Sequence, residues 1–442
     1  MNVAMNAASN ALLAKAWSKL SRIGSAIADQ ALLSATNFLA GVLLIRHAGD
    51  TQYGYYVLAT NAVLLLITLQ NAFFGAPLIN RLQPMAPEQQ GRFVAGLNRE
   101  QLRLLLAGFC CCLGGAAAAR LAGLIKGEAF AVAAAFSLMA LAMLGREFFR
   151  MVMLAHRHIG ALLRTDLFFV AVFLGGTALC LNSGAAGTAA LLAMAGGAAV
   201  AGGLLFAMAR RQGFVARSGD AAVLRQIASV GCWAATGGAI HWIYGQGYSY
   251  LIAGSLGVGA VAAVSATRLL MMPLNLVSAG VAQFMLPTAS GWLHREGAAT
   301  TLRRLCLSGG AMCLVALAYF AVVWQLRDWI FTSLLHKGAD GAYAGRDTLF
   351  CLWAGIFGLM VVRDQLIFLP VLRERFRVLA GLSCACACIA VALSYPAMQR
   401  WGAGGALAGM LTGEALNIFG IALLALREAR VGMEPAAQAE AA

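Results

Sequence analysis

The chain has 442 residues, of which 61% are hydrophobic and 11% are charged, and its formal net charge is +14. Soluble domains contain about 45–50% apolar and about 25% charged residues, so this composition excludes a water-soluble globular protein. Most of the surface must face lipid, and the sequence indicates a multi-pass membrane protein.

A membrane-spanning helix needs about 20 mostly apolar residues, and the chain contains about twelve such segments. In chain order they lie at 25–46, 54–80, 102–121, 129–155, 161–181, 187–209, 227–254, 260–287, 304–326, 347–372, 378–396 and 403–426. Only helices are expected, because an open sheet edge cannot satisfy its hydrogen bonds in lipid. The predicted fold class is therefore all-α, with about 12 transmembrane helices.

Basic residues are concentrated in alternate gaps between these segments. The remaining gaps hold only Arg46, Arg120, Lys126, Arg327, Lys337, Arg346 and Arg400, and Arg268 falls within a segment. This asymmetry is typical of the positive-inside rule and places both termini in the cytoplasm. It also argues against nucleic acid as a partner, since the positive charge follows the membrane topology.

The stretch 210–226 is the best candidate for a central linker. It separates a six-helix bundle at 25–209 from a second at 227–426, between an interfacial lead-in at 1–24 and a cytoplasmic tail at 427–442. Arg146-Glu147 near the end of the fourth segment and Arg363-Asp364 near the end of the tenth each precede a basic turn. Because six helices intervene, this indicates a parallel repeat of two similar bundles around a central cavity; the alternative is chance similarity between two basic turns.

Ionisable residues inside a span cost about 2.5–3.5 kcal/mol each, so each needs a reason. Arg268 in the eighth segment has no adjacent carboxylate, and Asn275 is expected to share its face beyond a kink at Pro273. Arg268 either meets a phosphate in a water-filled cavity or extends to a nearby interface. These two interpretations stay open.

Neighbouring residues on a helix point about 100° apart. We therefore expect Arg146, Glu147, Arg363 and Asp364 to form pairs between helices rather than with the adjacent residue. They are candidates for cytoplasmic gate pairs or for arginines that meet an anionic substrate; the alternative is anchoring of helix depth at the interface.

Asp29 and Glu414 are the candidates for proton or sodium coupling, although Asp29 also suits a helix N-terminus. The run His241 to Tyr250 contains Tyr244 and Gln246, which are candidates for contacts with sugar rings. An interfacial aromatic belt would explain the same run.

Glycines 405, 409 and 413 form a GxxxGxxxG row, which permits close helix packing, either static or sliding. The eleven cysteines have no metal-site or haem spacing and are expected to be small helix residues. The sequence contains no Walker A, HExxH or GxSxG motif, so catalytic residues, cofactors and metals are not expected.

The run ADQALLSATNFLAGVLLIRHAGDTQYGYYVLATNAVLLLITLQNAFFGAPL, from Ala28 to Leu78, resembles the start of bacterial polysaccharide-export flippases. This family belongs to the multidrug/oligosaccharidyl-lipid/polysaccharide exporter (MOP) superfamily, and it includes the O-antigen flippases. The matching elements are a polar-small-NFL stretch, an arginine near the end of the first span and Tyr53-Gly54 opening the second. The turn REFFR…AHRH and the Leu286-Pro287 ending of the eighth span are similar too.

The resemblance implies a flippase of the bacterial inner membrane. Its substrate would be an undecaprenyl-diphosphate-linked oligosaccharide for exopolysaccharide or O-antigen synthesis, moved by alternating access. A polysaccharide polymerase and a chain-length regulator are the implied partners besides membrane lipids. Two alternatives remain: a cation-coupled multidrug exporter of the same superfamily, which would favour an acidic cavity, and a membrane polymerase or ligase, which would need a longer outer loop than 327–346.

Overall fold

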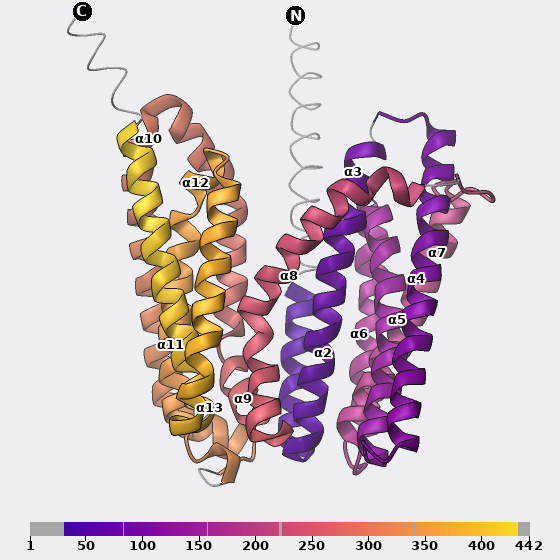
Figure 1. Cartoon of the computed structure of the whole chain (residues 1–442), viewed down its shortest axis with the longest axis horizontal. Coiled ribbons are helices and arrows are strands. Elements are labelled where there is room, and N and C mark those ends of the chain that lie inside the picture. Colours follow the sequence, from indigo (N-terminus) through magenta and orange to yellow (C-terminus); the bar gives the residue numbers. More distant parts are fainter. Residues whose placement is uncertain (1–30, 83, 157, 221–222, 339–340, 432–442) are drawn as a thin grey trace, which may run out of the picture. The chain divides into compact units, whose positions relative to one another are not determined.

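A computed structural model describes residues 31–82, 84–156, 158–220, 223–338 and 341–431, and these residues are almost entirely helical (Figure 1). The first helix runs from Ala31 to His47. It is followed by α2 (Asp50–Gln70), η1 (Asn71–Gly75), α3 (Ala76–Leu82), α4 (Pro87–Leu121), α5 (Gly127–Ala155), α6 (Ile159–Leu179), α7 (Ala186–Arg211), α8 (Val223–Leu256), α9 (Val258–Leu269), α10 (Met272–Trp329), η2 (Ile330–Leu334), η3 (Gly341–Tyr343), α11 (Arg346–Leu366), α12 (Phe368–Leu372) and α13 (Phe376–Val431).

Eight helices of the described chain are long and apolar enough to cross a membrane. Two of them are each a pair of helices joined at a sharp kink, α10 at Gly297 and α13 at Trp401–Gly402. The helix Ala31–His47 and α8 also correspond to predicted segments. When α10 and α13 are each taken as two helices, the helices follow the predicted segments in order. The all-α membrane fold is therefore confirmed, whereas the lead-in at 1–24 lies outside the described residues.

Glycine and proline set the main breaks. Gly257 between α8 and α9 has φ 90°, and Gly297 in the α10 kink has φ 81°, values in the left-handed region that favours glycine. Between α9 and α10 the chain leaves the helix at Leu270 and Met271, just before Pro273. Proline is tolerated in the first turn of a helix but not in its interior, so the predicted interruption at Pro273 is a boundary between two helices.

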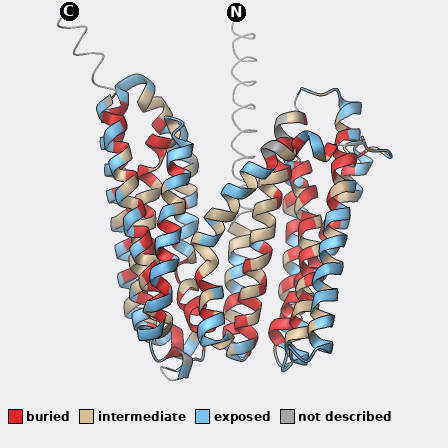
Figure 2. Cartoon of the chain, viewed as in Figure 1, coloured by how far each residue is buried: buried red, intermediate tan, exposed pale blue. Residues whose placement is uncertain are grey.

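The described chain divides into two compact units. Unit 1 contains residues 31–40 and 62–236, and unit 2 contains residues 41–61 and 237–431. In unit 1, α5 packs against α4 and α7, and α6 packs against α7. Its core includes Phe148, Val152 and Leu205, none of them exposed to solvent. In Figure 2, buried residues lie on the helix faces that meet within a unit.

In unit 2, α11 packs against α9, α10 and α13. The first part of α2 belongs to this unit and is hydrogen-bonded to α8. The Asn61 amide donates to the Ser249 hydroxyl at 3.3 Å, and the Trp242 indole donates to the Asn61 carbonyl at 3.0 Å. A side chain at Gly54 would overlap the backbone of Val258, so glycine permits this close approach of α2 to α9.

The GxxxGxxxG row packs against the preceding half of α13. After the kink at Trp401–Gly402, the second half of α13 folds back on the first. A Cβ at Gly409 would lie 2.8 Å from the Cα of Ser394, and one at Gly413 would lie 2.6 Å from the Cβ of Ala390. The glycines therefore let two consecutive helices of unit 2 touch through their backbones.

Candidate functional site

Unit 2 contains a buried ionic cluster built from α8, α10, α11 and α13. We call it the Glu414 cluster, and it consists of Glu414, Arg363, Asp364, Tyr244 and Ser278. The Arg363 guanidinium lies 2.8 Å from one Glu414 oxygen and 2.8 Å from Asp364. The Tyr244 hydroxyl donates to the other Glu414 oxygen at 2.5 Å, and the Ser278 hydroxyl donates to Asp364 at 3.3 Å.

The expectation for Arg363 and Asp364 is only partly met. Arg363 does reach another helix through Glu414, but contrary to the prediction it also pairs with its neighbour Asp364. Adjacent residues of a helix point about 100° apart, but the arginine side chain is long enough to reach back to its neighbour. The direction in which two residues leave the helix therefore does not by itself decide whether they pair. Both Arg363 (11% exposed) and Glu414 (3% exposed) are removed from solvent. Glu414 therefore depends on Arg363 for charge compensation, whereas Arg363 has both Glu414 and Asp364.

A second polar group, the Arg268 group, lies on α9, α8 and α11. Arg268 donates to Gln246 at 2.5 Å and to the Tyr248 hydroxyl at 3.3 Å. Its guanidinium carbon lies 5.5 Å from the centre of the Trp353 ring, a cation–π distance. Among the described residues no carboxylate forms an ion pair with Arg268, so its charge is held by neutral partners only.

The position of Arg268 along its helix bears on the two interpretations. Helix α9 begins at Val258, directly after the turn at Gly257, and Arg268 is near its other end. At about 1.5 Å per residue, Arg268 is about 16 Å along the helix from that turn. Its role in a cavity or at an interface remains a prediction.

Asn275 lies beyond the turn that separates α9 from α10. The turn consists of Leu270 and Met271. Asn275 is exposed in the first turns of α10. The expected common face of Arg268 and Asn275 remains a prediction.

The ionic cluster of unit 1, the Asp166 cluster, joins α5, α6 and η1. Arg146 and Arg150, one turn apart on α5, both bind the fully buried Asp166 of α6. Glu147 pairs with Arg150 at 3.4 Å and accepts a hydrogen bond of 3.4 Å from the Asn71 amide. Asn71 opens the π-helix η1, a local widening that is frequent at functional sites. Arg146 thus pairs between helices as predicted.

The two clusters share one arrangement. In each unit, an arginine near the end of a helix binds a carboxylate from a later helix. The acidic residue directly after that arginine accepts a hydrogen bond from an earlier helix, Asn71 to Glu147 in unit 1 and Ser278 to Asp364 in unit 2. The hydrogen bond to the acidic residue therefore recurs in both units, whereas the paired carboxylate comes from the next helix in unit 1 and from the second half of α13 in unit 2.

The aromatic run of α8 makes contacts within unit 2. Tyr250 donates to the Leu58 carbonyl at 2.8 Å and Trp242 to Asn61, while Tyr244 and Gln246 bind Glu414 and Arg268. The role of Tyr244 and Gln246 toward sugars remains a prediction. Asp29 lies outside the described residues, so its coupling role remains a prediction as well.

Several partners in these clusters were not predicted from the sequence. Asp166 falls within the fifth predicted segment, 161–181, and no partner was predicted for it. The one-turn spacing of Arg146 and Arg150 was the available signal that both face a single carboxylate. Asn71, Ser278 and Trp353 gave no comparable signal, because each acts only through a helix distant in sequence.

No protein-family model and no curated protein matches the chain. Solved structures do match it. The chain superimposes on the lipid II flippase MurJ with a TM-score of 0.73 and 9% identity, covering 90% of this chain and 86% of that one. It superimposes on an inward-facing multidrug-resistance MATE transporter of the MOP superfamily with a TM-score of 0.70 and 14% identity, covering 89% and 94%.

A further match is the MATE multidrug transporter DinF-BH, with a TM-score of 0.59 and 14% identity over 91% of this chain and 93% of that one. At these identities the likeness shows the fold. The chain has the fold of MOP-superfamily transporters, and the neighbours include both a lipid flippase and multidrug transporters.

Proposed function

We propose that this protein is a flippase that moves undecaprenyl-diphosphate-linked oligosaccharide units across the bacterial inner membrane by alternating access. The transported units would serve exopolysaccharide or O-antigen synthesis, where a polymerase and a chain-length regulator act on them. Two lines support the proposal: the resemblance of the first two spans to polysaccharide-export flippases, and a fold shared with the flippase MurJ.

The observation that carries the proposal is that no described carboxylate compensates the charge of Arg268. A cation within a membrane span is costly unless an anion accompanies it for part of the working cycle. Gln246, Tyr248 and Trp353 orient the guanidinium without neutralising it. A diphosphate group is a suitable anion, because a guanidinium binds phosphate oxygens through two parallel hydrogen bonds.

Arg146 and Arg363 are weaker candidates for diphosphate binding. Asp166 compensates Arg146, and Glu414 compensates Arg363, so each would have to release a buried carboxylate first. Arg268 has no carboxylate to release among the described residues. This difference also favours an anionic substrate over the cationic drugs of a multidrug exporter, since an organic cation would be repelled by a free guanidinium.

The Glu414 cluster is our candidate for proton or sodium coupling. Protonation of Glu414, or binding of a cation beside it, would loosen its ion pair with Arg363 and leave Arg363 to Asp364. The hydroxyl of Tyr244 would lose a charged acceptor at the same time. Such an exchange of partners is a two-state element of the kind that coupled transport needs.

Complementation tests the proposal. The gene is deleted in its host, and surface polysaccharide is measured together with the membrane face on which undecaprenyl-linked intermediates collect. Loss of polysaccharide with intermediates on the cytoplasmic face is the expected result. Arg268→Gln should fail to complement and Arg268→Lys should complement partly, because lysine keeps the charge but loses the bidentate geometry. Arg400→Gln, an exposed arginine, is the matched control.

Two results would contradict the proposal. Complete repeat units that collect unpolymerised on the periplasmic face would assign the chain to polymerisation or ligation. Normal surface polysaccharide with increased sensitivity to cationic drugs would assign it to multidrug export.

A further inference from the structure

One short stretch of α8 is attached to both polar sites of unit 2. Tyr244 donates to Glu414 at 2.5 Å. Gln246 and Tyr248 both accept hydrogen bonds from Arg268. We call the stretch from Tyr244 to Tyr248 the contact segment. It is little more than one turn of helix, about 6 Å along the axis, so the Glu414 cluster and the Arg268 group share one structural element.

Glycines separate the three contact residues of this segment, which reads Tyr-Gly-Gln-Gly-Tyr. A Cβ at Gly245 would meet no atom of the described chain within 4 Å. One at Gly247 would meet only Ile243, a side chain of the preceding turn, at an ordinary 3.5 Å. No close approach of another described helix therefore requires either glycine. Glycine in a helix interior is less stable than alanine, because it loses more conformational freedom, so the helix is weakened where both sites are attached.

The contact segment also has some room beside it. A cavity of about 10 Å³ lies between α8 and α13, and Tyr244 and Tyr248 line it together with Ser394 and Met410. A cavity of this size holds at most one water molecule. The two phenols therefore have room to change hydrogen-bond partner without displacing α13.

The contact segment holds Arg268 in an arrangement that competes with phosphate. One guanidinium nitrogen, Nη1, makes both hydrogen bonds, 2.5 Å to the Gln246 oxygen and 3.3 Å to the Tyr248 hydroxyl. A guanidinium binds phosphate oxygens through two parallel N–H groups, so a diphosphate gains most when Nη1 is released. Movement of the segment away from Arg268 should therefore raise the affinity of Arg268 for the anion.

The negative charge of Glu414 anchors the start of the contact segment. A hydrogen bond to an ionised carboxylate is about twice as strong as one between neutral groups. Neutralising Glu414 therefore weakens the bond from Tyr244. The other ionisable groups that face Glu414 or its partner are Arg363 and Asp364 on α11, Cys386 on the first half of α13 and His241 on α8.

We propose that Tyr244 is a positioning residue through which the charge of Glu414 sets the affinity of Arg268 for the diphosphate. The inference rests on the proposed function, because it takes Arg268 as the diphosphate site. While Glu414 is ionised, it holds Tyr244 and the contact segment in place, and the segment retains Arg268. When Glu414 is neutral, the segment relaxes at its glycines and Arg268 binds the anion. Such a linkage is reciprocal, so the bound anion favours the neutral form of Glu414.

Binding of farnesyl diphosphate to the purified full-length protein, measured by titration calorimetry in detergent, tests this linkage. Glu414→Gln should raise the affinity about fivefold or more, the ordinary size of a coupling between sites. In the Tyr244→Phe background the same substitution should change the affinity about twofold or less, as for independent sites. The difference between the backgrounds separates the link from the general attraction of an anion to a less negative protein. Glu147→Gln, which neutralises a carboxylate of unit 1, is the matched control and should leave the affinity unchanged.

The glycines of the contact segment provide a second variant. Gly245→Ala should stiffen the segment and reduce the effect of Glu414→Gln. Gly254→Ala is its matched control, because Gly254 lies on the same helix with equally open surroundings in the described chain. Alanine is preferred to glycine in helices, so both variants should raise the melting temperature alike. A difference in linkage between them is then not a difference in stability.

Hydrogen exchange without ligand gives a readout that does not depend on the diphosphate. Glu414→Gln should speed the exchange of backbone amides in the contact segment, and Gly245→Ala should slow it. Exchange that Glu414→Gln leaves unchanged would overturn the proposal. This measurement decides the link between Glu414 and the segment even if farnesyl diphosphate does not bind.

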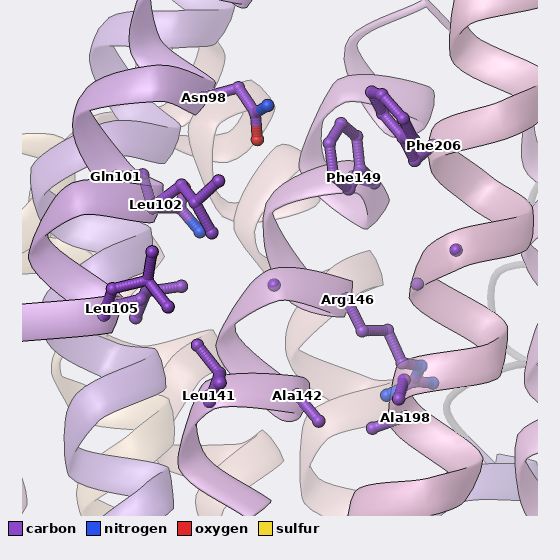
Figure 3. A pocket seen from close by; sticks show the side chains of 15 residues that line it. Asn98, Gln101, Leu102, Leu105, Leu141, Ala142, Arg146, Phe149, Ala198 and Phe206 are labelled. Atoms are coloured by element: carbon purple, nitrogen blue, oxygen red, sulfur yellow. The ribbon is translucent and has the colours of Figure 1, made fainter. Parts of the chain in front are cut away.

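The binding results separate this inference from the proposed function. Affinity that depends on Arg268 but not on Glu414, or on Glu414 equally with and without the Tyr244 hydroxyl, would overturn the inference alone. Unit 1 offers another place for an anion, because Arg146 lines a groove of about 380 Å³ between α4, α5 and α7 (Figure 3). Binding that survives Arg268→Gln but is lost in Arg146→Gln would assign the diphosphate to that groove. It would overturn this inference together with the role of Arg268 in the proposed function.

Discussion

The Arg363 guanidinium lies 2.8 Å from the Glu414 carboxylate inside unit 2, and both side chains are nearly inaccessible to solvent. Removing one member of such a pair strongly destabilises a protein, because the other charge stays buried without a partner. Replacing both members by apolar residues costs much less. This asymmetry defines a stability test that is independent of transport.

Arg363→Met should destabilise the protein by about 3–5 kcal/mol, because Glu414 would lose its cation. The double variant Arg363→Met/Glu414→Leu should recover most of that loss, since the carboxylate then left without its cation, Asp364, is 36% exposed rather than buried. Thermal unfolding of the purified protein in detergent measures both. A double variant as unstable as the single one would show that shape, rather than charge compensation, decides the stability.

Gln246→Glu should inactivate transport without unfolding the protein. The new carboxylate would occupy the position from which Gln246 now contacts Arg268 at 2.5 Å, and it would neutralise the guanidinium. Transport should therefore fall as far as in Arg268→Gln, while the melting temperature stays level or rises. Complementation together with thermal unfolding checks this, and full transport by Gln246→Glu would show that the free charge of Arg268 is not required.

Gly409→Ala should destabilise unit 2 by about 1–3 kcal/mol. The added methyl group would lie 2.8 Å from the Cα of Ser394, and helix backbones cannot shift as a side chain can. Gly404→Ala on the same helix is the control, because its methyl group would only meet Leu352 at an ordinary 3.8 Å. The two melting temperatures should differ by several degrees, and equal values would contradict the close contact.

The protein should lose stability at alkaline pH when buried tyrosines ionise, and Tyr343→Phe should remove part of that loss. Burial, and then the nearby Asp50 carboxylate, raise the pKa of Tyr343 above the ordinary value of about 10. A raised pKa in the folded state means that the stability contributed by the neutral phenol is complete below pH about 10 and is lost as the pH rises above it. The hydroxyl has no hydrogen-bond partner among the described residues, so Tyr343→Phe should cost little near pH 7.

Unfolding measured between about pH 8 and pH 11 checks this difference. The variant should gain on the unaltered protein only above pH about 10. A constant gap at every pH would mean that Tyr343 contributes through packing alone.

The helices were predictable because the thickness of the bilayer fixes the length of a spanning helix at about 20 residues. Each such helix is therefore visible as one continuous apolar segment of the sequence. The ionic clusters were predictable only in part, where a charged residue within a span marks one member of the cluster. Arg146 and Arg363 could be selected as candidates because an arginine within an apolar span is rare. Each is followed directly by an acidic residue, which indicates an ionic site.

The contacts of Asn71 and Ser278 depend on the rotation and depth of helices distant in the chain, which no local pattern encodes.

The order of residues along the chain has a consequence for biosynthesis. In both units the arginine is synthesised before its carboxylate: Asp166 arrives with the next helix, but Glu414 arrives only with the second half of α13. Arg363 therefore enters the membrane before Glu414 exists. Asp364, 2.8 Å away on the same helix in the folded protein, is thus the acid adjacent to Arg363 that already exists in that interval.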